Sequence, residues 1–174
     1  MKVRKLRLLF PLFLVLAAAS CGYSLQPEGA GRFPDPTVRI DLSPFMNDTP
    51  EADAGSYIAS KLREELRQRG FEGSFGRTEA DFQISGRLRE SRDEVLSHTA
   101  VRFALENRLT LTVKISVVDM RDGSILWNDE SLRESISYYS GLDPEYTASN
   151  RRAAFEEAVR RIVLRMAQTI RLIL

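Results

Sequence analysis

The longest regular pattern in this chain of 174 residues is an alternation that runs from Val101 to Val117. Every odd position in the run except Asn107 is apolar, whereas nearly all even positions carry polar or charged side chains. Since successive side chains of a strand point to opposite faces, the pattern predicts one long strand with a buried face and a solvated face. Fully extended, these residues would span about 56 Å, whereas a compact domain of this size is roughly 40 Å across. We therefore expect the strand to bend near Asn107 or to overhang the rest of the domain.

Two segments that precede this run are also typical of strands. Residues 37–42 alternate strictly, and residues 80–90 place Phe82, Ile84 and Leu88 on one face. Gly86 lies within the second segment, where a glycine indicates either a bulge or the close approach of another part of the chain.

Residues 119–123 contain an Asp-Gly pair, which predicts a hairpin turn. The strand that returns from this turn begins with Ile125 and Trp127 inward, but the inward positions have changed parity by Leu132. One extra residue in a strand moves all later side chains to the opposite face. We therefore expect a bulge around residues 128–130.

Two segments have the spacing of three and four residues that marks an amphipathic helix. The first is expected to begin with Thr49 as N-cap and Pro50 at the first helical position, and to end near Arg69, before Gly70. The second is expected to run from about Ser149 to the end of the sequence. Its apolar stripe could also form a coiled-coil seam, but it lacks heptad regularity, which favours a helix packed on a core. The connection before it is rich in aromatic residues: Tyr138, Tyr139 and Tyr146.

The predicted order of elements is therefore β-α-β-β-β-α over residues 37–174. A strand–helix–strand unit forms a right-handed crossover with parallel strands, and the later strands, joined by hairpins, run antiparallel. Both helices have one apolar face. The sequence thus predicts an α/β (α+β) fold, a two-layer sandwich with two helices on one face of a mixed four-stranded sheet. The other sheet face must be polar, and either solvated or covered by a partner.

The first 22 residues have the pattern of a bacterial secretory signal. Four cations precede an apolar run from Leu8 to Ala19, and small residues follow it. The run is too short to span a hydrocarbon core about 30 Å thick. We expect residues 1–20 to be a signal peptide that is removed.

Cys21, the single cysteine of the chain, follows Ala18-Ala19-Ser20 in a pattern that resembles a lipobox. It departs from the usual pattern in having Ala18 where leucine is common. The alternative is an ordinary signal peptide followed by a chance thiol, but an unpaired thiol is unusual in an oxidising periplasm. We expect Cys21 to carry acyl chains such as palmitate, and residues 21–36, rich in glycine and proline, to be a tether. In the bacterial sorting rule, Gly22 after the cysteine directs such a protein to the outer membrane.

The charge balance gives no indication of nucleic-acid binding. The chain has 25 Lys and Arg and 24 Asp and Glu, and the leader holds four of the cations and no acid, which leaves 21 − 24 = −3 for the rest.

The residue types also give no indication of catalysis, so the sequence favours an anchored binding domain over an enzyme. His98 is the only histidine, and it stands in a polar loop without a nucleophile elbow. A multi-histidine or zinc site is excluded by the same counts, and no glycine-rich phosphate loop or other cofactor motif is present. Asp81, Asp93 and Glu94 could form paired carboxylates, but they are more simply solvated charges.

Five motifs in order along the chain resemble the family of lipopolysaccharide-assembly lipoproteins, LptE. They are Cys21-Gly22-Tyr23, Phe45-Met46-Asn47-Asp48-Thr49, Ala80-Asp81-Phe82-Gln83-Ile84-Ser85-Gly86, Asp122-Gly123-Ser124-Ile125-Leu126-Trp127 and Asn150-Arg151-Arg152-Ala153-Ala154-Phe155. The resemblance implies two helices on a four-stranded sheet and a non-enzymatic, lipid-anchored protein of the outer membrane that faces the periplasm. It also implies a plug inside the LptD β-barrel that assists barrel assembly and binds lipopolysaccharide (LPS) on its way to the outer leaflet.

Candidate LPS contacts are the basic residues around the loop between the second and third strands. Arginine and histidine cations bind phosphates by charge-assisted hydrogen bonds, which selects Arg89, Arg92, His98 and Arg102. For each of them, ordinary surface charge, partly neutralised by Asp93 and Glu94, is the alternative.

Two other functions remain open at this stage. A lipoprotein activator of a peptidoglycan synthase also places a Phe-x-Asn-x-Thr stretch before a helix and an Ala-Asp strand. Such a protein usually has a longer linker than the tether of this chain. A periplasmic enzyme is disfavoured by the absence of catalytic motifs.

Overall fold

The computed structural model describes residues 38–71, 80–96 and 105–174, all within one compact unit that comprises residues 34–174. The expected signal peptide and tether lie outside these residues. So do three of the predicted site residues, Cys21, His98 and Arg102.

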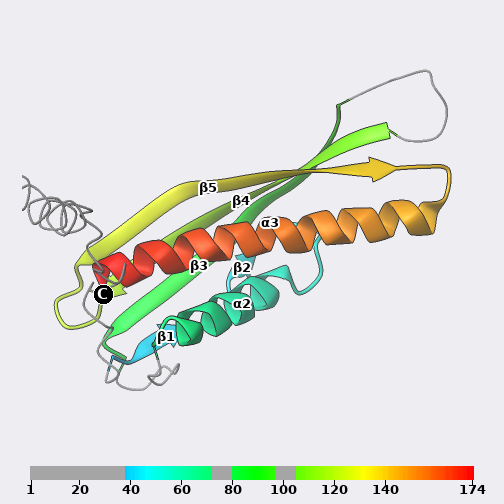
Figure 1. Ribbon diagram of the computed structural model, residues 1–174. Coiled ribbons are helices and arrows are strands. Elements are labelled where there is room, and N and C mark those ends of the chain that lie inside the picture. The colour runs from blue at the N-terminus through cyan, green and yellow to red at the C-terminus, as the bar shows by residue number, and fades with distance from the viewer. Residues whose placement is uncertain (1–37, 72–79, 97–104) are drawn as a thin grey trace, which may run out of the picture. The chain divides into compact units, whose positions relative to one another are not determined.

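The sheet has the strand order β1-β3-β4-β5 (Figure 1). Strand β1 (Ile40–Leu42) pairs in parallel with β3 (Phe82–Val95). Antiparallel ladders then join β3 to β4 (Leu105–Asp119) and β4 to β5 (Ile125–Ser140). The predicted mixed sheet and the parallel pairing of the two strands that flank the first helix are thus confirmed.

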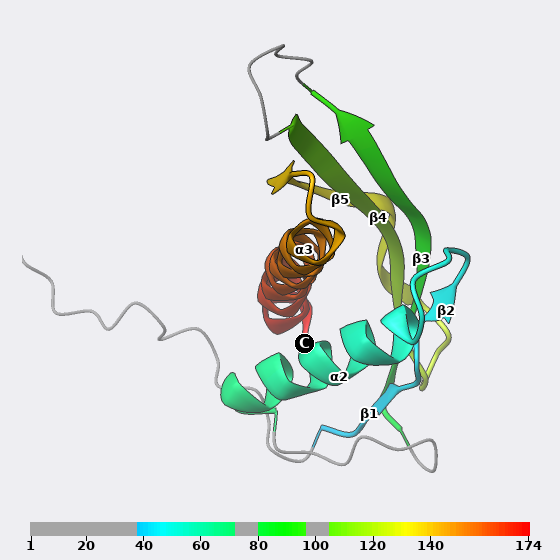
Figure 2. The ribbon, with the colours of Figure 1, turned by 90° about the vertical axis from the view of Figure 1, so that its right-hand side faces the viewer.

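The helices α2 (Ala54–Gln68) and α3 (Pro144–Ile173) cover one face of this sheet (Figure 2). Their apolar stripes and the odd-numbered apolar residues of β4 form a single core. Typical fully buried members are Ile58, Leu62, Leu111, Ile115 and Met166. Since no described helix covers the other sheet face, the fold is the predicted two-layer α+β sandwich.

The sheet has one strand more than the sequence predicted. The sequence pattern predicted no strand between residue 42 and the helix start at Thr49, but β2 (Met46–Asn47) pairs in parallel with Arg87 and Leu88 of β3. Phe45, just before β2, is buried between α2 and β3. A Cβ on Gly86 would lie 2.3 Å from the Phe45 ring, and one on Gly55 would lie 1.9 Å from its carbonyl oxygen. Gly86 therefore marks a close approach, as one of the two sequence interpretations had it.

The start of α2 was predicted wrongly. The helix begins at Ala54 after Asp53, which has a positive φ of 55° and makes no side-chain cap. Thr49 instead takes part in a local turn, where its N–H and hydroxyl donate to the side chain of Asn47. At the other end, Gly70 has a φ of 92°, and the N–H of Phe71 donates to Leu66 O at 3.1 Å, a Schellman motif as expected.

The last helix begins five residues earlier than predicted. Asp143 caps it by accepting from Glu145 N at 2.9 Å, and Pro144 occupies the first helical position. Tyr138 and Tyr139, expected in a connection, belong to β5.

Two register shifts in the ladder between β4 and β5 change which face of the sheet the side chains of β5 point to. One lies between Leu132 and Asp129, close to the predicted bulge. A second, between Trp127 and Ile125, was not predicted; it places Ile125 opposite Val118, so Ile125 is 66% exposed rather than inward. By contrast, both ladders of β4 continue in register through Asn107, whose amide donates to Ser140 Oγ at 2.7 Å.

Candidate functional site

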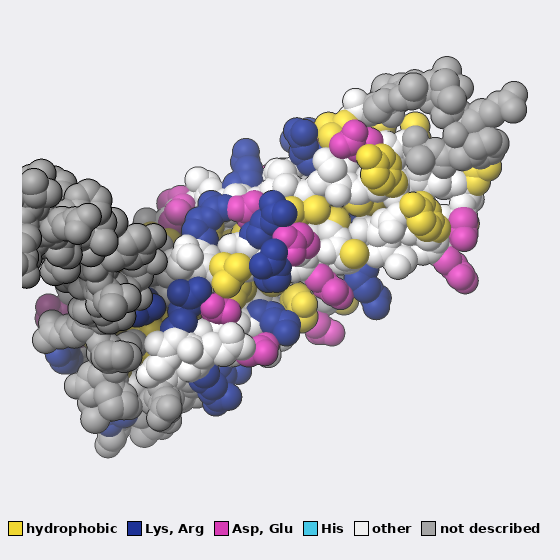
Figure 3. Space-filling view, in the orientation of Figure 1, with side chains coloured by type: hydrophobic (Ala, Val, Ile, Leu, Met, Phe, Trp, Pro, Cys, Tyr) yellow, Lys and Arg dark blue, Asp and Glu magenta, His cyan; other side chains and the backbone are white. Residues whose placement is uncertain are grey.

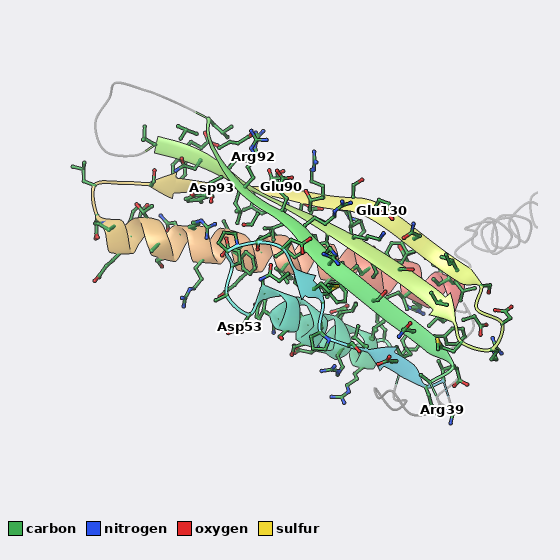
Figure 4. The ribbon with its side chains drawn as sticks, turned by 180° about the vertical axis from the view of Figure 1, so that it is seen from behind. Arg39, Asp53, Glu90, Arg92, Asp93 and Glu130 are labelled. Carbon is green, nitrogen blue, oxygen red and sulfur yellow. The ribbon has the colours of Figure 1, made fainter. Side chains whose placement is uncertain are left out.

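The sheet face that points away from α2 and α3, called the open face below, is built from polar side chains of β3, β4 and β5. Figure 4 views the described residues from this side, with the sheet in front of α3. The register between strands places a basic or hydroxyl side chain at most of its positions. Those used in the following paragraphs are Arg92, Arg108, Lys114, Glu130 and Arg133.

Arg89, the first predicted contact, lies at a register shift between Leu88 and Glu90. Its guanidinium is 3.5 Å from Glu130 Oε2, and Lys114 Nζ is 2.5 Å from the other oxygen of the same carboxylate. Lys114 is the main cause that lowers the pKa of Glu130 below its usual range. Two cations thus share one anion, which leaves a local excess of positive charge.

Arg92, the second predicted contact, lies on the open face and has a side chain that is 62% exposed. Its guanidinium is 3.1 Å from Glu94 Oε1. Glu94 lies directly opposite Arg108 in the ladder, so one carboxylate stands between two arginines. The structure therefore brings Arg89 and Arg92 to the same part of the sheet, whereas His98 and Arg102 lie outside the described residues.

Two arginines of this face were missed by the sequence reasoning. Arg108 on β4 and Arg133 on β5 form no ion pair with the residues that the structure describes. The alternation of β4 contained the signal for Arg108, because it stands at an even position. The predicted parity change contained the signal for Arg133, because it follows Leu132, which the sequence pattern places inward.

Asp93 does not neutralise the basic cluster, contrary to the sequence expectation. The register shift at Arg89 turns Asp93 toward the helix layer, where it accepts from Tyr138 Oη and from Arg151 Nε, both at 2.9 Å. Asp81, at the other end of β3, accepts from the N–H and the guanidinium of Arg39. The carboxylates of Asp81 and Asp93 are thus separate structural charges and do not form a pair.

Arg151 on α3 forms a polar network with the end of β3 and with the segment before α2. Besides Asp93 it donates to Glu51, which also accepts from Ser91 Oγ at 2.8 Å. The hydrogen bond from Arg151 holds the pKa of Glu51 below its usual range. Burial, followed by the bond to Asp93, raises the pKa of Tyr138 to about 12. Every ionisable group of the network is partnered, which is typical of a structural role.

Exposed apolar side chains gather where the hairpin ends and α3 begins. Figure 3, viewed from the helix side, shows hydrophobic side chains toward the right-hand end and mixed charges over the middle. The exposed members at this end are Val95, Leu96, Leu105, Tyr139, Leu142 and Tyr146.

Neither a metal site nor a membrane-spanning helix is found in the described part of the chain. No three His, Cys, Asp or Glu side chains come together there in a way that could hold a metal ion. No helix among the same residues is long and apolar enough to cross a membrane.

Comparisons with known proteins agree with this geometry. The family described as LptE, Lipopolysaccharide-assembly, matches residues 37–172, whereas no curated protein matches the chain. Among solved structures, lipoprotein B from Nitrosomonas europaea has a similar fold, with 12% identity, a TM-score of 0.50 and coverage of 77% of this chain and 82% of that one. A DUF330 protein from Xanthomonas campestris also has a TM-score of 0.50, with 11% identity and coverage of 75% and 81%. At such low identity these structures show a shared fold alone.

Proposed function

Because the chain belongs to the LptE family of lipopolysaccharide-assembly proteins, we propose that it is a lipid-anchored plug of the LptD β-barrel in the outer membrane. In this role it faces the periplasm, assists folding of the barrel and takes part in moving LPS to the outer leaflet. It acts by binding, without catalysis and without a cofactor.

The family match over residues 37–172 is the observation that carries this proposal. It includes every described residue except the last two, 173 and 174. The open face supports it physically. A plug must meet a polar barrel lumen, and the open face offers hydroxyl groups and charges of both signs on strands β3, β4 and β5.

Acylation of Cys21 would hold the domain at the membrane that contains the barrel. Two or more acyl chains make anchoring stable where one is marginal. The tether of residues 21–36 would reach roughly 20 Å as a flexible coil, so the domain would work at the membrane surface or inside a barrel. Mass spectrometry of the mature N-terminus tests this step, and an unmodified Cys21 would remove the anchor.

LPS phosphates would bind the basic part of the open face. Arg89 and Arg92, with His98 and Arg102 from the adjoining loop, remain the proposed contacts, and Arg108 and Arg133 extend the same surface. Arg89 and Lys114 share one carboxylate, and Arg108 and Arg133 form no ion pair with described residues, so these cations retain donors for a phosphate.

The LPS contact is tested with two variants that each lose three positive charges. Arg89→Ala/Arg92→Ala/Arg102→Ala removes three cations from the proposed site, and Arg152→Ala/Arg160→Ala/Arg161→Ala removes three from α3. We expect the first to weaken LPS binding by about tenfold or more and to reduce its salt dependence, and the second to change it little. Equal affinities for the two variants would contradict the site.

The partner is tested by isolating the tagged full chain from outer membranes. A large β-barrel is expected to co-purify. Recovery of a penicillin-binding protein instead would favour the alternative function, a lipoprotein activator of a peptidoglycan synthase.

A further inference from the structure

The sheet has two outer edges, one along β5 and one along the second half of β3. Each presents a row of backbone N–H and C=O groups that could pair with another strand. The two edges are treated differently in this fold, and Figure 2 shows β3 continuing past β2 with no described strand on its outer side.

Two carbonyl groups of the β5 edge accept hydrogen bonds from side chains of α3. Arg165 Nη2 donates to the carbonyl oxygen of Arg133 at 3.3 Å, and Asn150 Nδ2 donates to that of Tyr139 at 2.8 Å. Both carbonyls therefore point away from β4. Such contacts occupy acceptors that another strand would need, which protects this edge against pairing.

The β3 edge is covered only along its first half. β1 pairs with residues 82–84 and β2 with residues 87–88, and the last contact is the N–H of Asp48 to Leu88 O at 2.9 Å. No described strand pairs with the outer side of β3 after that point.

The direction of the remaining backbone groups follows from one hydrogen bond. The N–H of Leu96 donates to Glu106 O, so even-numbered residues after the register shift face β4. Ser91, Asp93 and Val95 consequently direct their N–H and C=O groups outward. Within the described residues these groups have no hydrogen-bond partner, and Val95 is 50% exposed.

We propose that the outer edge of Ser91–Val95 is a strand-addition site that takes an extended segment of the protein into which this chain docks. Three residues with outward donors and acceptors, repeated at every second position, match an extended backbone. The added segment would continue the line of β2. This inference rests on the proposed function, because the barrel would supply the segment.

Side-chain charges select a partner protein over a second copy of this chain. Pairing two copies antiparallel about the middle of the free stretch would place Asp93 directly opposite the same aspartate, and like charges at that position are destabilising. A segment with an acid opposite Arg92 and a base opposite Glu94 would match the edge instead.

Two proline variants test the site. Val95→Pro removes one outward N–H without removing a bond to β4, and Ser137→Pro does the same on the β5 edge, where no addition is proposed. We expect recovery of the barrel with the tagged full chain to fall about tenfold for Val95→Pro and to stay near wild type for Ser137→Pro. Equal recovery for the two variants and the wild type would overturn the strand-addition site. If the wild type recovers no barrel, the proposed function itself fails.

Deuterium exchange of the wild-type protein gives a measurement that needs no variant. The amides of Ser91, Asp93 and Val95 should exchange rapidly in the isolated chain and slowly in the barrel complex, whereas those of Arg92 and Glu94, which face β4, should be protected in both. Slow exchange of the three outward amides in the isolated chain, or their unchanged exchange on complex formation, would overturn the proposal. A concentration-dependent dimer that is abolished by Val95→Pro would show that a second copy is the occupant, which would also overturn it.

Discussion

Arg151 on α3 bonds to Asp93 at the end of β3, 58 positions earlier in the sequence, with 2.9 Å between Nε and Oδ2. The same guanidinium bonds to Glu51 in the segment before α2. One side chain thus connects α3, the end of β3 and the segment before α2. The side chains involved are between 21% and 35% exposed, so water screens these ion pairs only partly.

Arg151→Ala should lower the free energy of unfolding by about 1–3 kcal/mol, because it leaves two partly buried carboxylates without their cationic donor and with a neutral hydroxyl donor each. Arg152→Ala is the matched control. Arg152 is exposed and forms no ion pair with other described residues, so its loss should change stability by less than about 0.5 kcal/mol. Urea unfolding of both variants measures the difference, and equal stabilities would show that the network contributes nothing.

Acid should weaken the same network through Glu51. The hydrogen bond from Arg151 lowers the pKa of Glu51 in the folded chain below the ordinary value of 4.5. The folded state therefore holds the proton less tightly than the unfolded state, so this contribution to stability is complete above pH 4.5 and is lost as the pH falls through the lowered pKa. Glu51→Gln should cost about 1–2 kcal/mol at pH 7 and progressively less toward pH 3. In an Arg151→Ala background, Glu51→Gln should no longer have this pH-dependent effect, which urea unfolding at several pH values can check.

Gly86→Ala should destabilise the fold by about 1–3 kcal/mol, because the new methyl group would overlap the buried ring of Phe45. A smaller side chain at position 45 should relieve the overlap. Phe45→Leu/Gly86→Ala is therefore expected to be more stable than the sum of the two single effects predicts. Thermal unfolding of the four proteins in this cycle measures the coupling, and strictly additive effects would contradict the contact.

Elements whose signals are local were predicted well from the sequence. The alternation of β4 needs only the two faces of a strand, and Gly70 ends α2 because a glycine accepts the positive φ of a Schellman motif. Thr49 and Pro50 also have the local pattern of a helix start. In the structure, however, Thr49 donates to the side chain of Asn47 in a turn, and α2 begins later. Asn47 is only two residues from Thr49, but its position is fixed by the pairing of β2 with β3, which a local pattern does not show.

The sequence selected Arg89 and Arg92 as candidate contacts, and the structure places both within β3. Their role as LPS contacts stays a prediction. What the sequence could not show is the register shift at Arg89, which turns Asp93 from a neighbour of these cations into a partner of Arg151. Glu130, the anion that Arg89 shares with Lys114, lies on another strand 41 residues away. Register shifts and pairings between strands are properties of the folded sheet, so they decided both corrections.

Tyr138 should titrate at unusually high pH, with consequences for stability in alkali. Burial and the bond to Asp93 raise the pKa of Tyr138 to about 12, above the ordinary value of 10. The folded state thus holds this proton more tightly than the unfolded state, so the associated stability is present below pH 10 and is lost as the pH rises toward 12. Absorbance titration of the phenolates should show a late component that Tyr138→Phe removes and that Tyr139→Phe, altered at an exposed neighbour, retains. If Tyr138→Phe leaves the late component in place, that component belongs to another tyrosine, which would contradict the raised pKa of Tyr138.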